Sequence, residues 1–410
     1  MSLTLIGGGI ALAGAGSWLL ARRGLSDRSR HLLGLTQADE AAMGAALGVD
    51  VGRLFVLGQR LIWGITQADL IRVDLEATSR ELIAAFPELF VAHLLVAFTL
   101  RSTGKAEEAD ASLARARALA PADHPFAYLL PSDDEWACVA PPVALEEVVP
   151  GQIWRLGAYF NHGTSPFLEL AYATIVRRAD GGVVIYNPVA LSDEHHAAIT
   201  AIGEVTHLVV PTKFHSLFIT ENQARFPAAK TYGVPGHRQN PPSAKLRFDG
   251  FLRAGAPLFP GEITEIPIGG HQFEEVALIH RPSRTAILHD MVTACTRDRA
   301  HPFWYRLYSF VWGLDDRVGL YSYQPMMWTN LFALRRSLRA LLEEDVARVL
   351  AVHSPASATA GDGRELLRQN FQWVTQLGVL EHAVLLRDFF GEQPGFLRDF
   401  VRYLAAQRGA

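Results

Sequence analysis

The spacing of apolar residues along the chain changes at about residue 150. Before that point apolar side chains recur every three or four positions, as at Leu54 and Leu57, which is the period of a helix with one buried face. After Pro150 short apolar runs alternate with helical stretches. The pattern therefore predicts a helical region over 36–130, followed by a layered α/β domain over 149–377.

The second domain is expected to contain strands and helices in two alternating blocks. The expected strands are 153–160, 171–177, 183–186, 206–210, 230–233, 263–267, 275–280, 285–289 and 348–352. The expected helices are 193–202, 217–225, 304–312, 325–344 and 363–377. Residues 378–410 are expected to add a helical C-terminal extension, and the proline-rich segment 121–150 is expected to connect the two parts.

Residues 90–121 resemble one tetratricopeptide repeat. Ala97 is small where the two helices of a repeat cross, Gly104 lies in the turn, and Pro121 closes the unit. A generic helical hairpin is the alternative interpretation. Because a single repeat cannot bury its own apolar face, this region is expected to pack against the domain behind it or against a protein partner.

The N-terminal segment 1–24 is predicted to be a membrane anchor. Residues 3–20 contain no charged side chain, and Arg22 and Arg23 follow at once, which places the following side in the cytoplasm. The protein is thus expected at the cytoplasmic side of the inner membrane, or in the cytoplasm. A buried or peripheral helix is the alternative, and a dinucleotide-binding turn at 6–11 is disfavoured because the chain downstream is helical.

Composition and charge narrow the partners. The chain has 410 residues and a net charge of −4, without a run of Lys and Arg long enough to follow a phosphate backbone, so no nucleic-acid partner is expected. Cys138 and Cys295 lie far apart and lack the spacing of a metal-binding pair. A small-molecule substrate or a protein partner is expected instead.

Polar side chains directly follow several apolar strands of the second domain. In layered α/β folds functional side chains gather where strands end and loops begin. The residues at these positions are Asn187, Lys213, His215, His271, Asp290 and His353. We expect them to lie close together.

This order of strand-terminal residues resembles the metallo-β-lactamase superfamily, over about 149–373. The main motif of that superfamily is T-H-x-H-x-D-H, and the matching segment here is TKFHSLF at 212–218. His215 keeps the second histidine, whereas Lys213, Leu217 and Phe218 replace three ligands. The resemblance implies an αββα sandwich preceded by the tetratricopeptide-like helices.

The later ligand positions of the superfamily are partly kept. His271 stands at the position of the next histidine, Asp290 at that of the bridging aspartate, His353 at that of the final histidine, and Asn187 at that of an early strand-ending aspartate. Within the superfamily the chain is similar to the DUF4336 family, which brings no known reaction with it. The shared segments are 186–191, 211–218, 226–229 and 280–290.

The resemblance implies at most one metal ion, zinc or iron, held by His215, His271, Asp290 and His353, or none. Lys213 stands where a ligand is expected, and it would orient an anionic substrate or repel a cation. The first hypothesis is a metal-dependent hydrolase in which Lys213 and Asp290 act in catalysis. The alternative is a non-catalytic scaffold that recruits a partner through its helical region. The aromatic helix at 304–312 is expected to form core or a lid.

Overall fold

The computed structural model describes residues 37–66, 73–161, 165–239, 243–253, 255–295, 301–314, 316–321 and 323–392. The predicted membrane anchor at 1–24 lies outside the described residues. Within the described ranges, no helix combines the length and the apolar content that crossing a bilayer requires.

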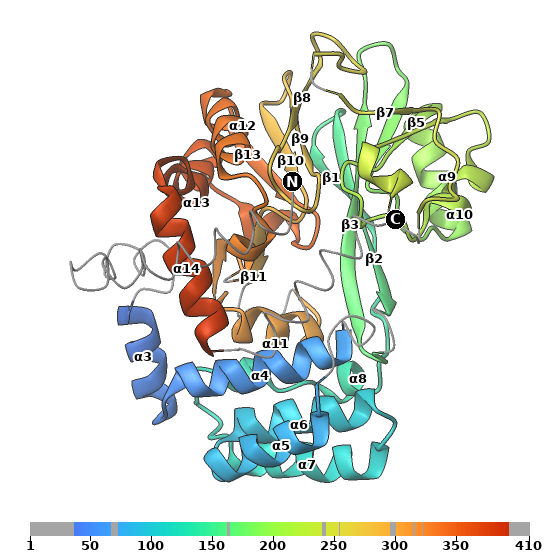
Figure 1. The fold of residues 1–410 in the computed structure, drawn as a ribbon. Coiled ribbons are helices and arrows are strands. Elements are labelled where there is room, and N and C mark those ends of the chain that lie inside the picture. The colour runs from blue at the N-terminus through green and yellow to red at the C-terminus, as the bar shows by residue number, and fades with distance from the viewer. Residues whose placement is uncertain are drawn as a thin grey trace.

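Two β-sheets form the centre of the second domain (Figure 1). The larger sheet has the order β1-β2-β3-β4-β5-β6-β7, antiparallel from β1 to β4 and parallel from β4 to β7. Its strands are β1 Leu145–Val149, β2 Ile153–Asn161, β3 Leu168–Arg177, β4 Val183–Tyr186, β5 Val205–Val209, β6 Lys230–Gly233 and β7 Gly250–Phe251. The smaller sheet has the order β13-β10-β9-β8. Its strands are β8 Ile263–Pro267, β9 Val276–His280, β10 Thr285–Leu288 and β13 Arg348–Ala351.

Helices cover the outer face of each sheet. α9 (Asp193–Ile202) and α10 (Ile219–Arg225) lie on the larger sheet, and α12 (Leu331–Glu343) and α13 (Gly363–Gln376) lie on the smaller one (Figure 1). A third apolar cluster lies between the sheets and includes Val184 and Tyr186 of β4, whereas Val183 and Ile185 of the same strand belong to the cluster under α9 and α10. These layers confirm the predicted αββα sandwich.

The helical region packs against one end of the sandwich (Figure 1). It consists of α3 (Gln37–Leu47), α4 (Val51–Thr66), α5 (Leu75–Ala85), α6 (Phe90–Ser102), α7 (Ala106–Leu119), η1 (Ala127–Leu129) and α8 (Asp133–Trp136). The α6–α7 hairpin turns at Gly104, whose φ of 83° suits glycine. Its assignment to the tetratricopeptide class stays a prediction.

One helix of the second domain joins this helical core. α11 (Phe303–Val311) buries Phe303, Leu307 and Phe310 in the same apolar cluster as α4 and α6. A two-stranded ribbon of β11 (Thr293–Cys295) and β12 (Arg317–Gly319) flanks α11 along the chain. The helical region and the sandwich therefore share one core through α11.

The segment predicted as a single helix over 325–344 is instead divided. A 3-10 turn η3 (Gln324–Met327) is followed by an extended stretch, and α12 begins only after Asn330. The Asn330 side chain accepts the backbone N–H of Ala333 and caps the helix. After η4 (Ala356–Thr359) and α13, α14 (Val379–Glu392) occupies part of the predicted C-terminal extension, and the rest lies outside the described residues.

Candidate metal centre at the strand ends

Three of the predicted strand-end residues converge at one edge of the sandwich. His215 comes from the loop after β5, Asp290 lies two residues after the end of β10, and His353 lies two residues after the end of β13. One ligand atom from each lies within 4.8 Å of the other two, so these atoms could hold a metal ion. The parallel pairing of β10 with β13 brings Asp290 and His353 to the same edge of the smaller sheet. The packing of the two sheets against each other brings His215 of the larger sheet next to them.

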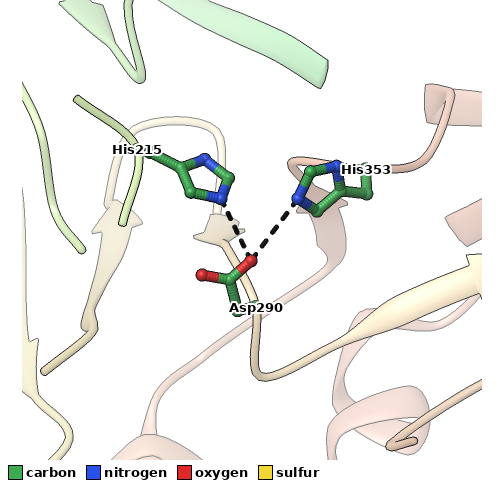
Figure 2. A group of neighbouring side chains, drawn as sticks. All are labelled: His215, Asp290 and His353. Carbon is green, nitrogen blue, oxygen red and sulfur yellow. Dashed lines mark hydrogen bonds and ion pairs between the residues drawn. The ribbon is translucent and has the colours of Figure 1, made fainter. Parts of the chain in front are cut away.

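One oxygen of Asp290 is the centre of the group. Nε2 of His215 lies 3.1 Å from Oδ1, and Nε2 of His353 lies 3.4 Å from the same oxygen. Figure 2 shows both imidazole rings directed at this carboxylate. All three side chains are largely buried, which strengthens the interaction of their charges.

Oxygen atoms hold the other nitrogen of each imidazole. Nδ1 of His215 lies 2.8 Å from Oδ1 of Asn187. Nδ1 of His353 lies 3.2 Å from the carbonyl oxygen of Leu170 and 3.6 Å from Oε1 of Glu169. Because an oxygen acceptor at Nδ1 favours the proton there, Nε2 of each neutral ring keeps a lone pair that a metal ion beside Asp290 could bind. Without a metal ion, only a protonated ring can donate from Nε2 to the carboxylate.

Asn187 needs an uncommon backbone conformation to reach His215. Its φ is 54°, in the left-handed region that asparagine tolerates better than most residues. The side-chain amide also donates from Nδ2 to the carbonyl oxygen of Tyr172, 3.0 Å away. The residue at the end of β4 therefore fixes the ring of His215 and is itself fixed by β3.

Hydrogen bonds with Glu275 and Gln324 hold the backbone around Asp290. Glu275 accepts the backbone N–H of His289 and that of Met291, at 2.8 and 2.9 Å. Nε2 of Gln324 donates to the carbonyl oxygen of Asp290 at 2.7 Å. Burial raises the pKa of the Glu275 carboxyl to about 8. These bonds fix the turn that directs the Asp290 side chain at the two histidines.

The charges of the group are coupled. Burial alone would raise the pKa of Asp290, but the charges and hydrogen bonds of His215 and His353 hold it well below its usual value. Burial alone would likewise lower the pKa of His353, but hydrogen bonding to Asp290 and the charge of Glu169 raise it to about 9. Without a metal the group therefore contains an ion pair between His353 and Asp290.

His271, the fourth predicted metal ligand, does not join the group. Its Nε2 lies 2.8 Å from Oε1 of Gln324, and its Nδ1 accepts the backbone N–H of Phe273 at 3.1 Å. Both ring nitrogens are thus engaged, and burial lowers the pKa of the ring to about 4. The prediction placed His271 correctly at a strand end, but the turn after β8 directs its ring to η3 instead of Asp290.

Part of the sequence matches a family model. Residues 150–308 match the model described as "Domain of unknown function (DUF4336)". This segment is a DUF4336 domain. The match runs from the start of β2 into α11, so it includes His215 and Asp290 but ends before His353. No curated protein matches the sequence.

Solved metallo-β-lactamases are similar to part of this chain. The enzyme from Pontibacter korlensis is 13% identical with a TM-score of 0.39, and the match covers 58% of this chain and 100% of that one. The enzyme from Hirschia baltica is 15% identical with a TM-score of 0.38, covering 57% and 98%. The enzyme FIM-1 from Pseudomonas aeruginosa, in its mono-zinc form, is 14% identical with a TM-score of 0.37, covering 60% and 97%.

A cavity of about 300 Å³ opens onto the group. Its polar end contains the three residues of the group with Glu169, Asn187 and Thr293. The remaining wall is mostly aromatic and comes from the DUF4336 domain, the segment after it and the helical region. Its aromatic members are Trp63, Phe160, Phe214, Phe218, Phe273, Trp304, Tyr305, Tyr308, Tyr321 and Tyr323. The aromatic helix α11 contributes side chains to the core, as predicted, and also to this wall; its action as a lid stays a prediction.

Lys213, predicted to orient a substrate, is absent from the described residues that line the cavity. Its backbone N–H bonds the carbonyl oxygen of Phe273, and its Nζ lies 5.3 Å from the centre of the Phe214 ring. Burial lowers the pKa of its ammonium group, and the charge of Glu274 opposes this. The side chain thus lies beside Phe214, which itself lines the cavity, and a role of Lys213 in catalysis stays a prediction.

Glu169 and Trp63 are among the contributors to the site that the sequence prediction did not include. Glu169 lies in β3 between Leu168 and Leu170, and a carboxylate inside an apolar strand is a signal that sequence reading could have used. Trp63 lies on α4, and nothing in its helical spacing distinguishes it from other buried residues of that helix. Its position in the cavity depends on how the helical region packs against the sandwich.

The raised pKa of His353 predicts a pH dependence of stability in metal-free protein. Because the folded-state pKa of about 9 exceeds the ordinary value of 6.5, the ion pair stabilises the fold fully below pH 6.5, and this contribution is lost as pH rises through 9. We expect the free energy of unfolding of chelator-treated protein to fall by roughly 2–3 kcal/mol between about pH 6.5 and pH 9. Urea unfolding at several pH values measures this fall, which should be much smaller in Asp290→Asn because that variant lacks the ion pair. An equal pH dependence of the free energy of unfolding in Asp290→Asn would contradict the ion pair between His353 and Asp290.

Proposed function

We propose that this protein is a metal-dependent hydrolase with a single divalent metal ion held by His215, Asp290 and His353. One observation carries the proposal: both imidazoles present Nε2 to the same carboxylate oxygen while oxygen acceptors hold each Nδ1. Histidines that bind catalytic metals are oriented in this way, by a second hydrogen bond on the nitrogen that does not bind the metal.

The donor set suits a catalytic ion. Two imidazole nitrogens and one carboxylate oxygen bind zinc in hydrolases that leave a coordination position open, and the same set binds iron in enzymes with open positions. The three donor atoms already lie within 4.8 Å of one another. Their side chains are held by Asn187, Leu170 and the turn after β10, so little ordering would accompany binding of an ion.

A single ion fits better than a pair. In the superfamily motif that TKFHSLF at 212–218 resembles, Leu217 and Phe218 stand at two positions where the second metal finds its ligands. Their apolar side chains line the cavity here. Apolar groups offer no lone pair to a metal ion, so the second site is replaced by part of the substrate cavity.

A bound ion at this position would polarise a substrate carbonyl or phosphoryl group and lower the pKa of a water molecule. The side chains of the protein supply the rest. Glu169 faces the cavity beside His353 and can accept a proton there, because its carboxylate lies 3.6 Å from Nδ1 of that ring. The aromatic walls exclude water and strengthen the electrostatic interactions at the polar end.

A non-catalytic binding protein is the second candidate. The observation in its favour is that Asp290 and His353 already form an ion pair without any metal. In that case the cavity would bind a ligand without converting it. The recruitment of a protein partner by the helical region stays a prediction.

Hydrolysis of phenyl hexanoate by protein loaded with Zn²⁺ or Fe²⁺ tests the hydrolase proposal. We expect turnover that disappears on treatment with a chelator and returns when the metal is restored. His215→Gln and Asp290→Asn should lack this recovery, whereas Asp345→Asn, which changes an exposed carboxylate outside the cavity lining, should keep it. Loaded protein that hydrolyses neither this ester nor a thioester, amide or phosphodiester panel would favour the second candidate.

A further inference from the structure

We propose that the cavity selects an uncharged ligand with an apolar or aromatic body, and that Trp63 of the helical region is part of the selecting wall. The inference rests on the proposed function in naming the substrate class of the same site. It also makes the helical region a component of that site. The wall, the charges, the mouth of the cavity and the attachment of α4 each support it.

The wall is aromatic on the side away from Asp290. Trp63 packs against Trp312 with ring centres 4.7 Å apart and against Tyr323 at 5.8 Å. Trp304 and Tyr308 continue the wall along α11, with ring centres 5.2 Å apart. Rings that support one another in this way offer a large, rigid apolar surface to a ligand.

The ionisable side chains of the cavity lie against one another. Asp290 lies between His215 and His353, and Glu169 lies beside His353. Among the described residues that line the cavity there is no Lys or Arg. In metal-free protein an anionic ligand would therefore lose its hydration without meeting an unpaired cationic side chain, and a cationic ligand would compete with the histidines for the carboxylates. An uncharged ligand avoids both costs.

The mouth of the cavity is apolar as well. Leu217 is 66% exposed and Phe214 is 39% exposed, although both are large apolar side chains. Both also line the cavity, on the loop that contains His215. Exposed apolar side chains at the edge of a concave site are expected where an apolar ligand enters.

The helical region is fixed to the cavity through α4. Nε2 of Gln59 on α4 donates to the carbonyl oxygen of Val311 at the end of α11, at 2.8 Å. Phe55 of α4 also packs edge-on against Phe310 of α11, with ring centres 5.4 Å apart. Trp63 is therefore held in the wall by direct contacts between the two helices, and removal of its indole should enlarge the cavity on that side.

Two fluorescent probes that differ by one charged group test the selection. N-phenyl-1-naphthylamine is uncharged, and 8-anilino-1-naphthalenesulfonate carries a sulfonate on a similar ring system. We expect the uncharged probe to bind at least about 100-fold more tightly. Competition by neopentylbenzene should displace it, whereas the isosteric cation benzyltrimethylammonium should not. Equal or tighter binding of the sulfonate, or equal displacement by the cation, would overturn the inference.

Matched variants locate the binding. Leu217→Glu places a charge at the mouth of the cavity and should lower the affinity for the uncharged probe about 10-fold or more, because the bound probe would then remove water from a carboxylate. Phe332→Glu changes a side chain of similar exposure, 70%, on α12 and should have no effect. Trp63→Ala should weaken the probe about 10-fold, and Trp63→Phe should restore part of the loss. Thermal melting of each variant checks that it folds.

The two proposals fail in different ways in this experiment. Probe binding needs neither metal nor turnover, so selective binding in chelator-treated protein supports this inference even if phenyl hexanoate is not hydrolysed. Metal-dependent hydrolysis with no probe selectivity would sink this inference and leave the hydrolase proposal standing. If Phe332→Glu lowered the affinity for the probe as much as Leu217→Glu, the probe would bind outside the cavity, and this result would also overturn the inference.

Discussion

Asp290→Asn is expected to weaken metal binding more than about 100-fold, since losing even an outer partner of a metal ligand costs roughly 10–100-fold. Asp290 is the residue that both imidazoles face, through one carboxylate oxygen. The amide keeps the shape of the side chain but lacks the charge that attracts a cation. Titration with Zn²⁺ in the presence of a competing chelator measures the affinity.

Asp345→Asn is the matched control for the loss of one carboxylate. Asp345 lies at the surface, where it pairs with Arg284 and Arg364, and it is not among the described residues that line the cavity. It should leave the zinc affinity unchanged. Equal affinities for wild type and Asp290→Asn would remove Asp290 from the metal site.

Arg306→Ala is expected to lower the free energy of unfolding by about 3–5 kcal/mol, because it breaks a buried ion pair. The guanidinium of Arg306 is fully buried on α11 and donates to both carboxylate oxygens of Glu135, at 2.6 and 3.1 Å. It also donates from Nε to the carbonyl oxygen of Tyr128 at 3.0 Å. These bonds fasten α11 to the connector between the two parts of the chain.

An exposed ion pair in the same helical region provides the comparison. Arg115 lies 2.8 Å from Glu88 at the surface, and Arg115→Ala should cost no more than about 1 kcal/mol. Urea unfolding of both variants measures the difference. Because α11 lines the cavity, Arg306→Ala should also weaken the uncharged probe. A cost for Arg306→Ala as small as that for Arg115→Ala would mean that α11 is held mainly by its apolar contacts.

The sequence pattern predicted the elements of the sandwich closely where one period dominates. β4 is wholly apolar and α9 begins at the capping residue Ser192, and both have the predicted bounds. The pattern failed at 325–344, where the helical period continued across Pro325 although the chain makes a 3-10 turn there. β1 was also missed, because it lies at the edge of the sheet within a segment rich in proline.

The sequence predicted which residues follow the strands of the candidate site, but it did not predict where their side chains point. Placement after an apolar strand identified His215, Asp290 and His353, because parallel and facing strands end at a common edge. The same rule included His271 and Lys213, whose directions depend on turns and on contacts distant in the sequence. The helical region's contribution through Trp63 was beyond the reach of the sequence, since it follows from packing between two parts of the chain.

The number of zinc ions bound per chain at equilibrium tests the central claim most directly. Dialysis of metal-free protein against buffered Zn²⁺, followed by elemental analysis, gives this number. One ion per chain in the wild type, lost in His215→Gln, Asp290→Asn and His353→Gln alike, is the result that the three-residue site predicts. Two ions per chain, no ion, or one ion that persists in all three variants would contradict it.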